Sequence, residues 1–131
     1  MQAYALAAGV LATLIAAVHS VLGEILIFRH LRGGSVVPAL SAPPLKKRHI
    51  RILWASWHLV SVCAVGFSAV LVRLAFPGSR YSLQEVFMAA AIFTFLGGAL
   101  LVLVGTKGRH PGWIGLLGVT ALAWAATTSA H

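Results

Sequence analysis

The chain has 131 residues, of which 60% are hydrophobic and only 9% are charged. Soluble domains carry charges on about a quarter of their residues, so this composition leaves too little polar surface to cover a globule in water. It excludes an ordinary soluble domain and predicts an integral membrane protein. Ten Lys and Arg stand against two acids. In a membrane protein such a bias reports topology, and we expect no nucleic-acid partner.

Four apolar segments are long enough to cross a bilayer, which takes about 20 helical residues. They cover residues 3–28, 52–76, 86–105 and 112–127. Backbone amides in lipid must be satisfied within their own segment, so each span is expected to be a helix. The predicted fold is therefore all-α: a single transmembrane domain over residues 1–131, built as a four-helix bundle with four transmembrane helices.

Basic residues gather in two of the three loops between these spans. Residues 29–51 form a long basic loop, and a short loop follows the third span. Together they hold Arg29, Arg32, Lys46, Lys47, Arg48, Arg51, Lys107 and Arg109. The positive-inside rule places both loops in the cytoplasm and both termini on the outer face. We expect a bacterial plasma membrane, with the first span retained because it has no basic n-region before it.

Small residues recur every three positions on the fourth span, at Gly112, Gly115, Gly118 and Ala121, and Gly97, Gly98 and Gly105 mark the third. Such spacing lets helix backbones approach closely in lipid. We expect tight packing within the bundle, with a homo-oligomer through the same helix faces as the alternative.

Glu24 is the only acid inside a span, about four residues or ~6 Å of helix rise from the end of the first span. Intramembrane ionisable residues are functional by default, so we expect Glu24 to be a metal ligand, a proton carrier or a catalytic residue. The alternative is an interfacial pair with Arg29 or Arg51. Ser20, one turn earlier, is expected to donate a hydrogen bond to the Glu24 carboxylate.

Two histidines lie at a similar depth in the cytoplasmic half of the membrane. His19 is about nine residues or ~14 Å inside the first span, and His58 is about ~10 Å inside the second. Gly23 removes side-chain bulk one turn after His19, which leaves room for a partner helix or a ligand. The plain alternative for His58 is a single hydrogen bond to a neighbouring helix. Trp54 and Trp57 are expected in an interfacial aromatic belt.

These positions predict a metal site made from His19, Glu24, His58 and His110, the last of which lies in the turn before the fourth span. Imidazoles with one carboxylate suit a divalent transition metal such as zinc, iron or copper. Haem b held by His19 and His58 is a variant. Such a centre would serve redox or hydrolytic chemistry on a hydrophobic or lipid-like small molecule.

Transport is the second hypothesis. Four spans with one Glu in the first are similar in outline to the small multidrug-resistance exporters, and the similarity covers the architecture alone. It implies a proton-coupled transporter in which Glu24 exchanges protons for cationic substrates.

Two further hypotheses remain open. Lys107, Arg109 and Arg51 form a basic rim that is expected to hold an anionic headgroup of a membrane lipid or another anionic substrate. Alternatively, the chain is a structural subunit of a membrane complex with no chemistry of its own.

Overall fold

The structure is a computed structural model, and it describes residues 2–33 and 46–129. Within these ranges the chain is helical, which confirms the predicted all-α class. The elements are α1 (Gln2–Leu22), a π-helical turn η1 (Gly23–Phe28), α2 (Arg29–Gly33), α3 (Lys47–Ala75), α4 (Leu83–Thr106) and α5 (Gly112–Thr128). The first three run on without a break, so they form one long helical rod.

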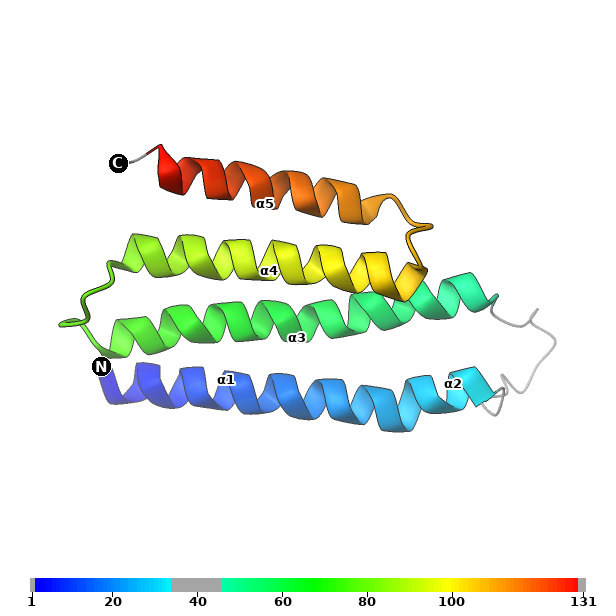
Figure 1. The fold of residues 1–131 in the computed structure, drawn as a ribbon. Helices are drawn as coiled ribbons and strands as arrows, with labels where there is room; N and C mark the ends of the chain where they lie inside the picture. Colours follow the sequence, from blue (N-terminus) through cyan, green and yellow to red (C-terminus); the bar gives the residue numbers. More distant parts are fainter. Residues whose placement is uncertain (1, 34–45, 130–131) are drawn as a thin grey trace.

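The long helices lie antiparallel in a single row, in chain order, and both termini lie at the same end (Figure 1). α1 packs on α3, α3 on α4, and α4 on α5. In the described part of the chain α1 makes no extensive contact with α5, so the row is open, and the four-helix bundle expected from the sequence stays a prediction. In lipid an apolar face needs no protein partner, and nothing therefore forces the row to close.

Three helical stretches are long and apolar enough to cross a membrane: Gln2–Arg32, Lys47–Ala75 and Leu83–Thr106. α5 is also apolar but has 17 residues, a length of about 26 Å. Large apolar side chains such as Leu14, Ile15 and Leu122 face outward along these helices. These features are compatible with an integral membrane protein, and the fourth crossing stays a prediction.

α1 and α3 approach closely near the end of the molecule that holds the termini. The Ser68 hydroxyl donates to the carbonyl oxygen of Gly9 at 2.6 Å and lies 2.7 Å from the Thr13 hydroxyl. A Cβ atom on Gly9 would lie 2.8 Å from the Val72 side chain. Small and hydroxyl-bearing residues therefore join these two helices, as is usual where lipid provides no hydrophobic drive.

The predicted packing of the fourth span is wrong in part. A Cβ atom on Gly115 or Gly118 would have no described neighbour within 4 Å, so this stripe of small residues faces open space. The glycines predicted to pack on the third span do meet side chains of α3. Gly98 faces Leu59, and Gly105 faces the ring of Trp54. The stripe on α5 is free because only one face of α5 packs on α4 in an open row.

Candidate functional site

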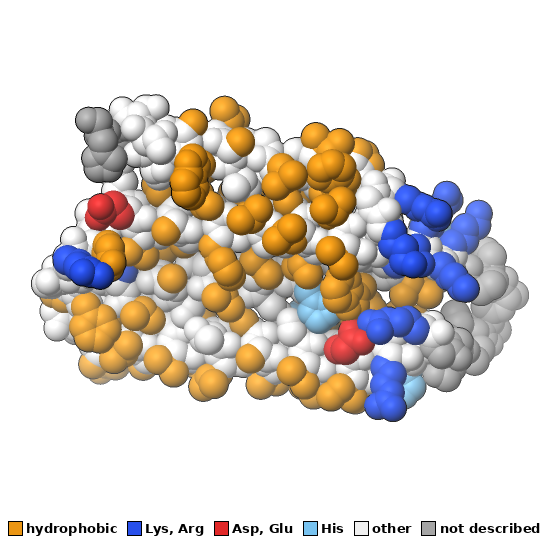
Figure 2. Space-filling model, in the orientation of Figure 1, with side chains coloured by type: hydrophobic (Ala, Val, Ile, Leu, Met, Phe, Trp, Pro, Cys, Tyr) orange, Lys and Arg blue, Asp and Glu red, His pale blue; other side chains and the backbone are white. Residues whose placement is uncertain are grey.

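A group of polar side chains joins the C-terminal end of α1, together with η1 and α2, to the N-terminal half of α3. We call it the polar cluster, and its members are Ser20, Glu24, Arg32, Trp54, His58 and Ser61. Figure 2 shows that Lys and Arg side chains gather at the same end of the molecule, with an acidic and a histidine side chain beside them. The cluster therefore lies where the apolar helices give way to a basic end.

Glu24 is held by two donors from different elements. The Arg32 guanidinium bonds both carboxylate oxygens, at 2.6 and 2.8 Å, and the indole N–H of Trp54 donates to Oε2 at 3.0 Å. The expected partners Arg29 and Arg51 are not the ones that pair with it. Arg32 lies eight residues further along the rod, about 80° away around an ideal α-helix, and the wider π-helical turn η1 between the two residues reduces this offset. The two side chains keep 41% and 54% of their surface exposed, so the pair lies at the edge of the cluster.

His58 connects to the first helix through a chain of hydroxyls. Its Nδ1 lies 3.0 Å from the Ser20 hydroxyl, which in turn donates to the hydroxyl of Ser61 at 2.8 Å. Ser20 has a single proton, so it accepts from an Nδ1–H of His58. The expected Ser20 bond to Glu24 is therefore not formed, because Ser20 faces α3.

The other ring nitrogen of His58 faces Glu24 without touching it. Nε2 lies 3.9 Å from Oε2 of Glu24, beyond hydrogen-bond distance, and the His58 side chain is only 14% exposed. Nε2 is buried and finds no hydrogen-bond partner among the described residues. With the proton on Nδ1, this nitrogen presents a lone pair to a carboxylate oxygen.

His19 occupies the next turn and is packed by Trp57. The two rings lie flat on one another, with centroids 4.3 Å apart and planes 7° from parallel. The Trp57 indole N–H donates to the His19 carbonyl oxygen at 3.1 Å. Like that of His58, Nε2 of His19 is buried with no described partner.

The interfacial aromatic belt expected for Trp54 and Trp57 stays a prediction, and the structure gives the contacts of the two indoles. Both indoles are half-buried between the rod and α3, and both use their N–H groups on the rod, one on Glu24 and the other on His19. A Trp one turn inside a predicted span is typical of either arrangement. Whether such a Trp faces the membrane interface or packs between two helices depends on which helices lie side by side.

The π-helical turn η1 sets the geometry of this region. π-helical turns are rare in proteins, and those that occur are often found at functional sites. η1 starts at Gly23, where a Cβ atom would lie 2.7 Å from Cδ1 of Trp57, so only glycine admits the indole. It ends at Phe28, which is 2% exposed and packs near the rings of Trp57 and His58, at centroid distances of 6.0 and 6.1 Å. The room predicted beside Gly23 is thus filled by a partner helix.

The four predicted metal ligands are only partly brought together. His58 lies near Glu24, and His19 lies on the adjacent turn of the rod. His110 is in the exposed α4–α5 turn, where its Nδ1 accepts the Gly112 N–H at 3.1 Å. Within residues 2–33 and 46–129, no group of three or more His, Cys, Asp or Glu side chains is placed to hold a metal ion.

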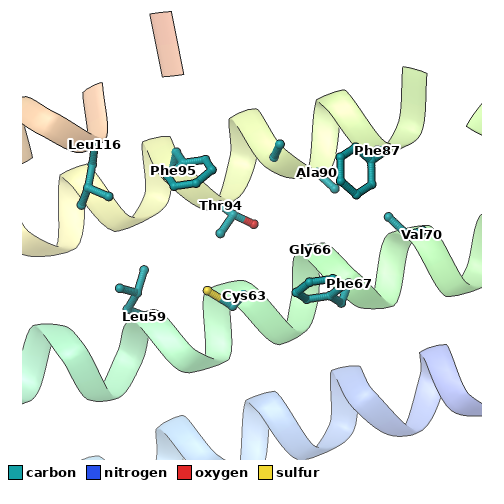
Figure 3. A pocket seen from close by; sticks show the side chains of 11 residues that line it. Leu59, Cys63, Gly66, Phe67, Val70, Phe87, Ala90, Thr94, Phe95 and Leu116 are labelled. Atoms are coloured by element: carbon teal, nitrogen blue, oxygen red, sulfur yellow. The ribbon is translucent and has the colours of Figure 1, made fainter. Parts of the chain in front are cut away.

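Two grooves lie beside this region. One, of about 390 Å³, starts at Ser20, His58 and Ser61 and continues along α1 and α3 toward Thr13 and Phe93. The other, of about 300 Å³, lies between α3, α4 and α5 and is lined mostly by apolar side chains, with the single cysteine, Cys63, among them (Figure 3). Of these two grooves, the first reaches the polar cluster and the second does not.

Lys107, Arg109 and Arg51, predicted to form one basic rim, lie in different settings. Arg51 lines a groove with Arg32 and Lys47, whereas Lys107 and Arg109 are exposed in the α4–α5 turn and line no described groove.

Comparisons of the chain with protein-family models, with curated proteins and with solved structures found no match. Its function has to be argued from the chemistry of the polar cluster.

Proposed function

We propose that this chain is an integral membrane protein that takes up and releases a proton at the Glu24–His58 pair and couples this to the movement of a small substrate. One observation carries the proposal. Nε2 of His58 is buried and has no hydrogen-bond partner among the residues that the structure describes, and it lies 3.9 Å from a carboxylate oxygen of Glu24. A site of this kind at the inner end of apolar helices is typical of a proton relay.

The unprotonated pair is unfavourable in two ways. A buried nitrogen with no hydrogen bond costs about 1–3 kcal/mol, and its lone pair faces the negative charge of the carboxylate. A proton on Nε2 removes both costs, since a shift of about 1 Å then gives a charge-assisted hydrogen bond to Glu24. Arg32 and Trp54 hold the carboxylate in place for either state.

The groove beside His58 supplies a place for the substrate. It brings the Ser20 and Ser61 hydroxyls and the His58 ring to one end of an otherwise apolar path along α1 and α3. A small amphiphilic cation would bury its apolar part along this path, with its charge close to Glu24. With the basic end in the cytoplasm and both termini outside, uptake would occur from the inner leaflet.

The test uses the full chain in liposomes with a pH gradient and ethidium as the cationic probe. We expect ethidium movement that depends on the gradient, lost in Glu24→Gln and in His58→Gln. Glu85→Gln is the matched control, because Glu85 caps the far end of α4 through Ser82. Movement by Glu24→Gln at the wild-type rate contradicts the proposal. Wild type that neither moves ethidium nor carries protons supports the structural-subunit alternative.

A metal centre is the second candidate, and a specific observation favours it. His19 and His58, on adjacent helices, each have a buried Nε2 with no partner in the described part of the chain, and Glu24 lies next to His58. Two imidazoles and a carboxylate suit zinc, iron or copper, once Arg32 releases the carboxylate. Such an ion would serve redox or hydrolytic chemistry on a hydrophobic molecule.

The geometry favours a bare ion over haem b. Ser20 bonds His58 directly, which holds α1 and α3 together where a porphyrin between His19 and His58 would have to lie. Metal analysis of the purified chain tests this candidate. We expect a stoichiometric ion that is lost when His19→Ala and His58→Ala are combined; a chain that binds no added zinc, iron or copper contradicts it.

A further inference from the structure

A second polar groove, distinct from the one beside His58, opens at the basic end of the molecule between α2, α3 and the end of α4. Its volume is about 620 Å³. Arg32, Lys47 and Arg51 bring three positive charges to it, and its other lining side chains are apolar or aromatic. Trp54 and Gly105 form part of this apolar lining, with the Trp54 ring lying against α4 where Gly105 has no side chain.

The charge of this groove is not balanced within the chain. Of the two acids in the sequence, Glu24 is bonded by Arg32 and Glu85 caps the opposite end of α4. Among residues 2–33 and 46–129, neither Lys47 nor Arg51 makes an ion pair. Two cations that flank one cavity without a counter-charge attract an anion, and guanidinium groups suit phosphate oxygens in particular.

The position of the groove indicates what kind of anion it takes. It lies where α2 ends, α3 begins and α4 ends, at the level where a membrane-spanning helix leaves the hydrocarbon. Its charged rim and apolar wall match a molecule with a phosphate at one end and a hydrocarbon chain at the other. Anionic glycerophospholipids of the inner leaflet have this chemistry.

We propose that the groove of Arg32, Lys47 and Arg51 binds the phosphate of an anionic phospholipid, with Trp54 against its glycerol and upper acyl region. This site does not rest on the proton coupling proposed for Glu24 and His58. Its two other basic side chains, Lys47 and Arg51, take no part in the polar cluster, whereas Arg32 and Trp54 belong to both sites. A bound phosphate that draws Arg32 away would leave Glu24 with Trp54 alone.

The test compares two double variants of equal charge in the full chain. Lys47→Gln with Arg51→Gln removes two charges from the groove, and Lys107→Gln with Arg109→Gln removes two from the exposed turn at the same end. Both keep Arg32 and Glu24. Each protein is delipidated in detergent and titrated with phosphatidylglycerol brominated on its acyl chains, with brominated phosphatidylcholine as the neutral lipid, and quenching of tryptophan fluorescence is measured.

We expect wild type and the turn variant to prefer phosphatidylglycerol to the same extent. The groove variant should lose roughly fivefold in this preference per basic side chain, about 25-fold in all. An equal loss in both variants means unspecific surface attraction and overturns the proposal, as does no loss in the groove variant. Displacement of the lipid by millimolar inorganic phosphate would make the ligand a soluble phosphate and overturn the lipid assignment. Helix content and monodispersity, measured for all three proteins, show that the variants are folded.

Discussion

Trp57 stacks on the ring of His19 and also bonds its backbone: the ring centroids lie 4.3 Å apart with planes 7° from parallel, and the indole N–H donates to the His19 carbonyl oxygen. The contact depends on a glycine, because a Cβ atom on Gly23 would overlap the indole. The absence of a side chain at Gly23 therefore allows Trp57 of α3 to pack closely against the first helix.

Gly23→Ala tests this dependence. The added methyl forces Trp57 to move and to give up its hydrogen bond, so we expect a loss of about 2–3 kcal/mol in the free energy of unfolding. The measurement is unfolding in mixed detergent micelles, followed by circular dichroism. Gly115→Ala is the control, because its Cβ would meet no described atom within 4 Å, and it should be neutral or slightly stabilising. Equal stability of the two variants would contradict the contact.

Trp54→Phe removes the indole N–H that Glu24 accepts while keeping an aromatic ring against α4. Hydrogen bonds to charged groups contribute about 1.5–3 kcal/mol, and the half-exposed carboxylate can recover part of this from water, so we expect a loss of about 1–2 kcal/mol. Trp124→Phe is the control, since Trp124 is 62% exposed on α5. A loss of the same size in both variants would show that ring volume, and not the bond to Glu24, is what matters.

The sequence predicts the helices well and their sideways arrangement poorly. Apolar length gave the four segments, because crossing a bilayer is a property of each segment alone. Which helices touch depends on close contacts such as Gly105 on Trp54 and Ser68 on Gly9, and no period in the sequence reports them. The open row and the misplaced packing of Gly115 follow from this.

For the candidate site, the sequence predicts which polar residues lie near one another but not which side chains they bond. Glu24, His19 and His58 were singled out by counting residues from the basic boundaries, and the structure places them on neighbouring turns of α1, η1 and α3. The sequence places Arg32 in the basic loop, whereas in the structure the helical rod continues through Arg32 and its guanidinium bonds Glu24 across the π-helical turn η1. No pattern in the sequence predicts the π-helical turn that starts at Gly23.

Arg32 and Glu24 should be coupled energetically, whereas Arg29 should not be coupled to Glu24. A double-mutant cycle with Glu24→Gln and Arg32→Gln is expected to give a coupling of about 1 kcal/mol, the upper end for partly exposed pairs, because both carboxylate oxygens are bonded. The same cycle with Arg29→Gln is the control and should give about zero. Both are measured by unfolding at low salt and repeated at high salt, where the coupling should shrink. A coupling to Arg29 as large as that to Arg32 would restore the pairing expected from the sequence.

The tautomer of His58 gives the most direct check on the polar cluster. Ser20 donates its only proton to Ser61, so it can only accept from His58, and the neutral ring must carry its proton on Nδ1. Nitrogen-15 NMR of the chain in lipid nanodiscs should show a protonated Nδ1 and a bare Nε2 for the neutral ring, and on acidification Nε2 should gain a proton. Ser20→Ala removes the acceptor, and we expect the proton to move to Nε2, where it can reach Glu24. Ser56→Ala, an exposed position on α3, should leave the spectrum of His58 unchanged. A neutral wild-type ring protonated on Nε2 would mean that His58 already donates to Glu24, and the unpartnered nitrogen that carries the proposed proton site would not exist.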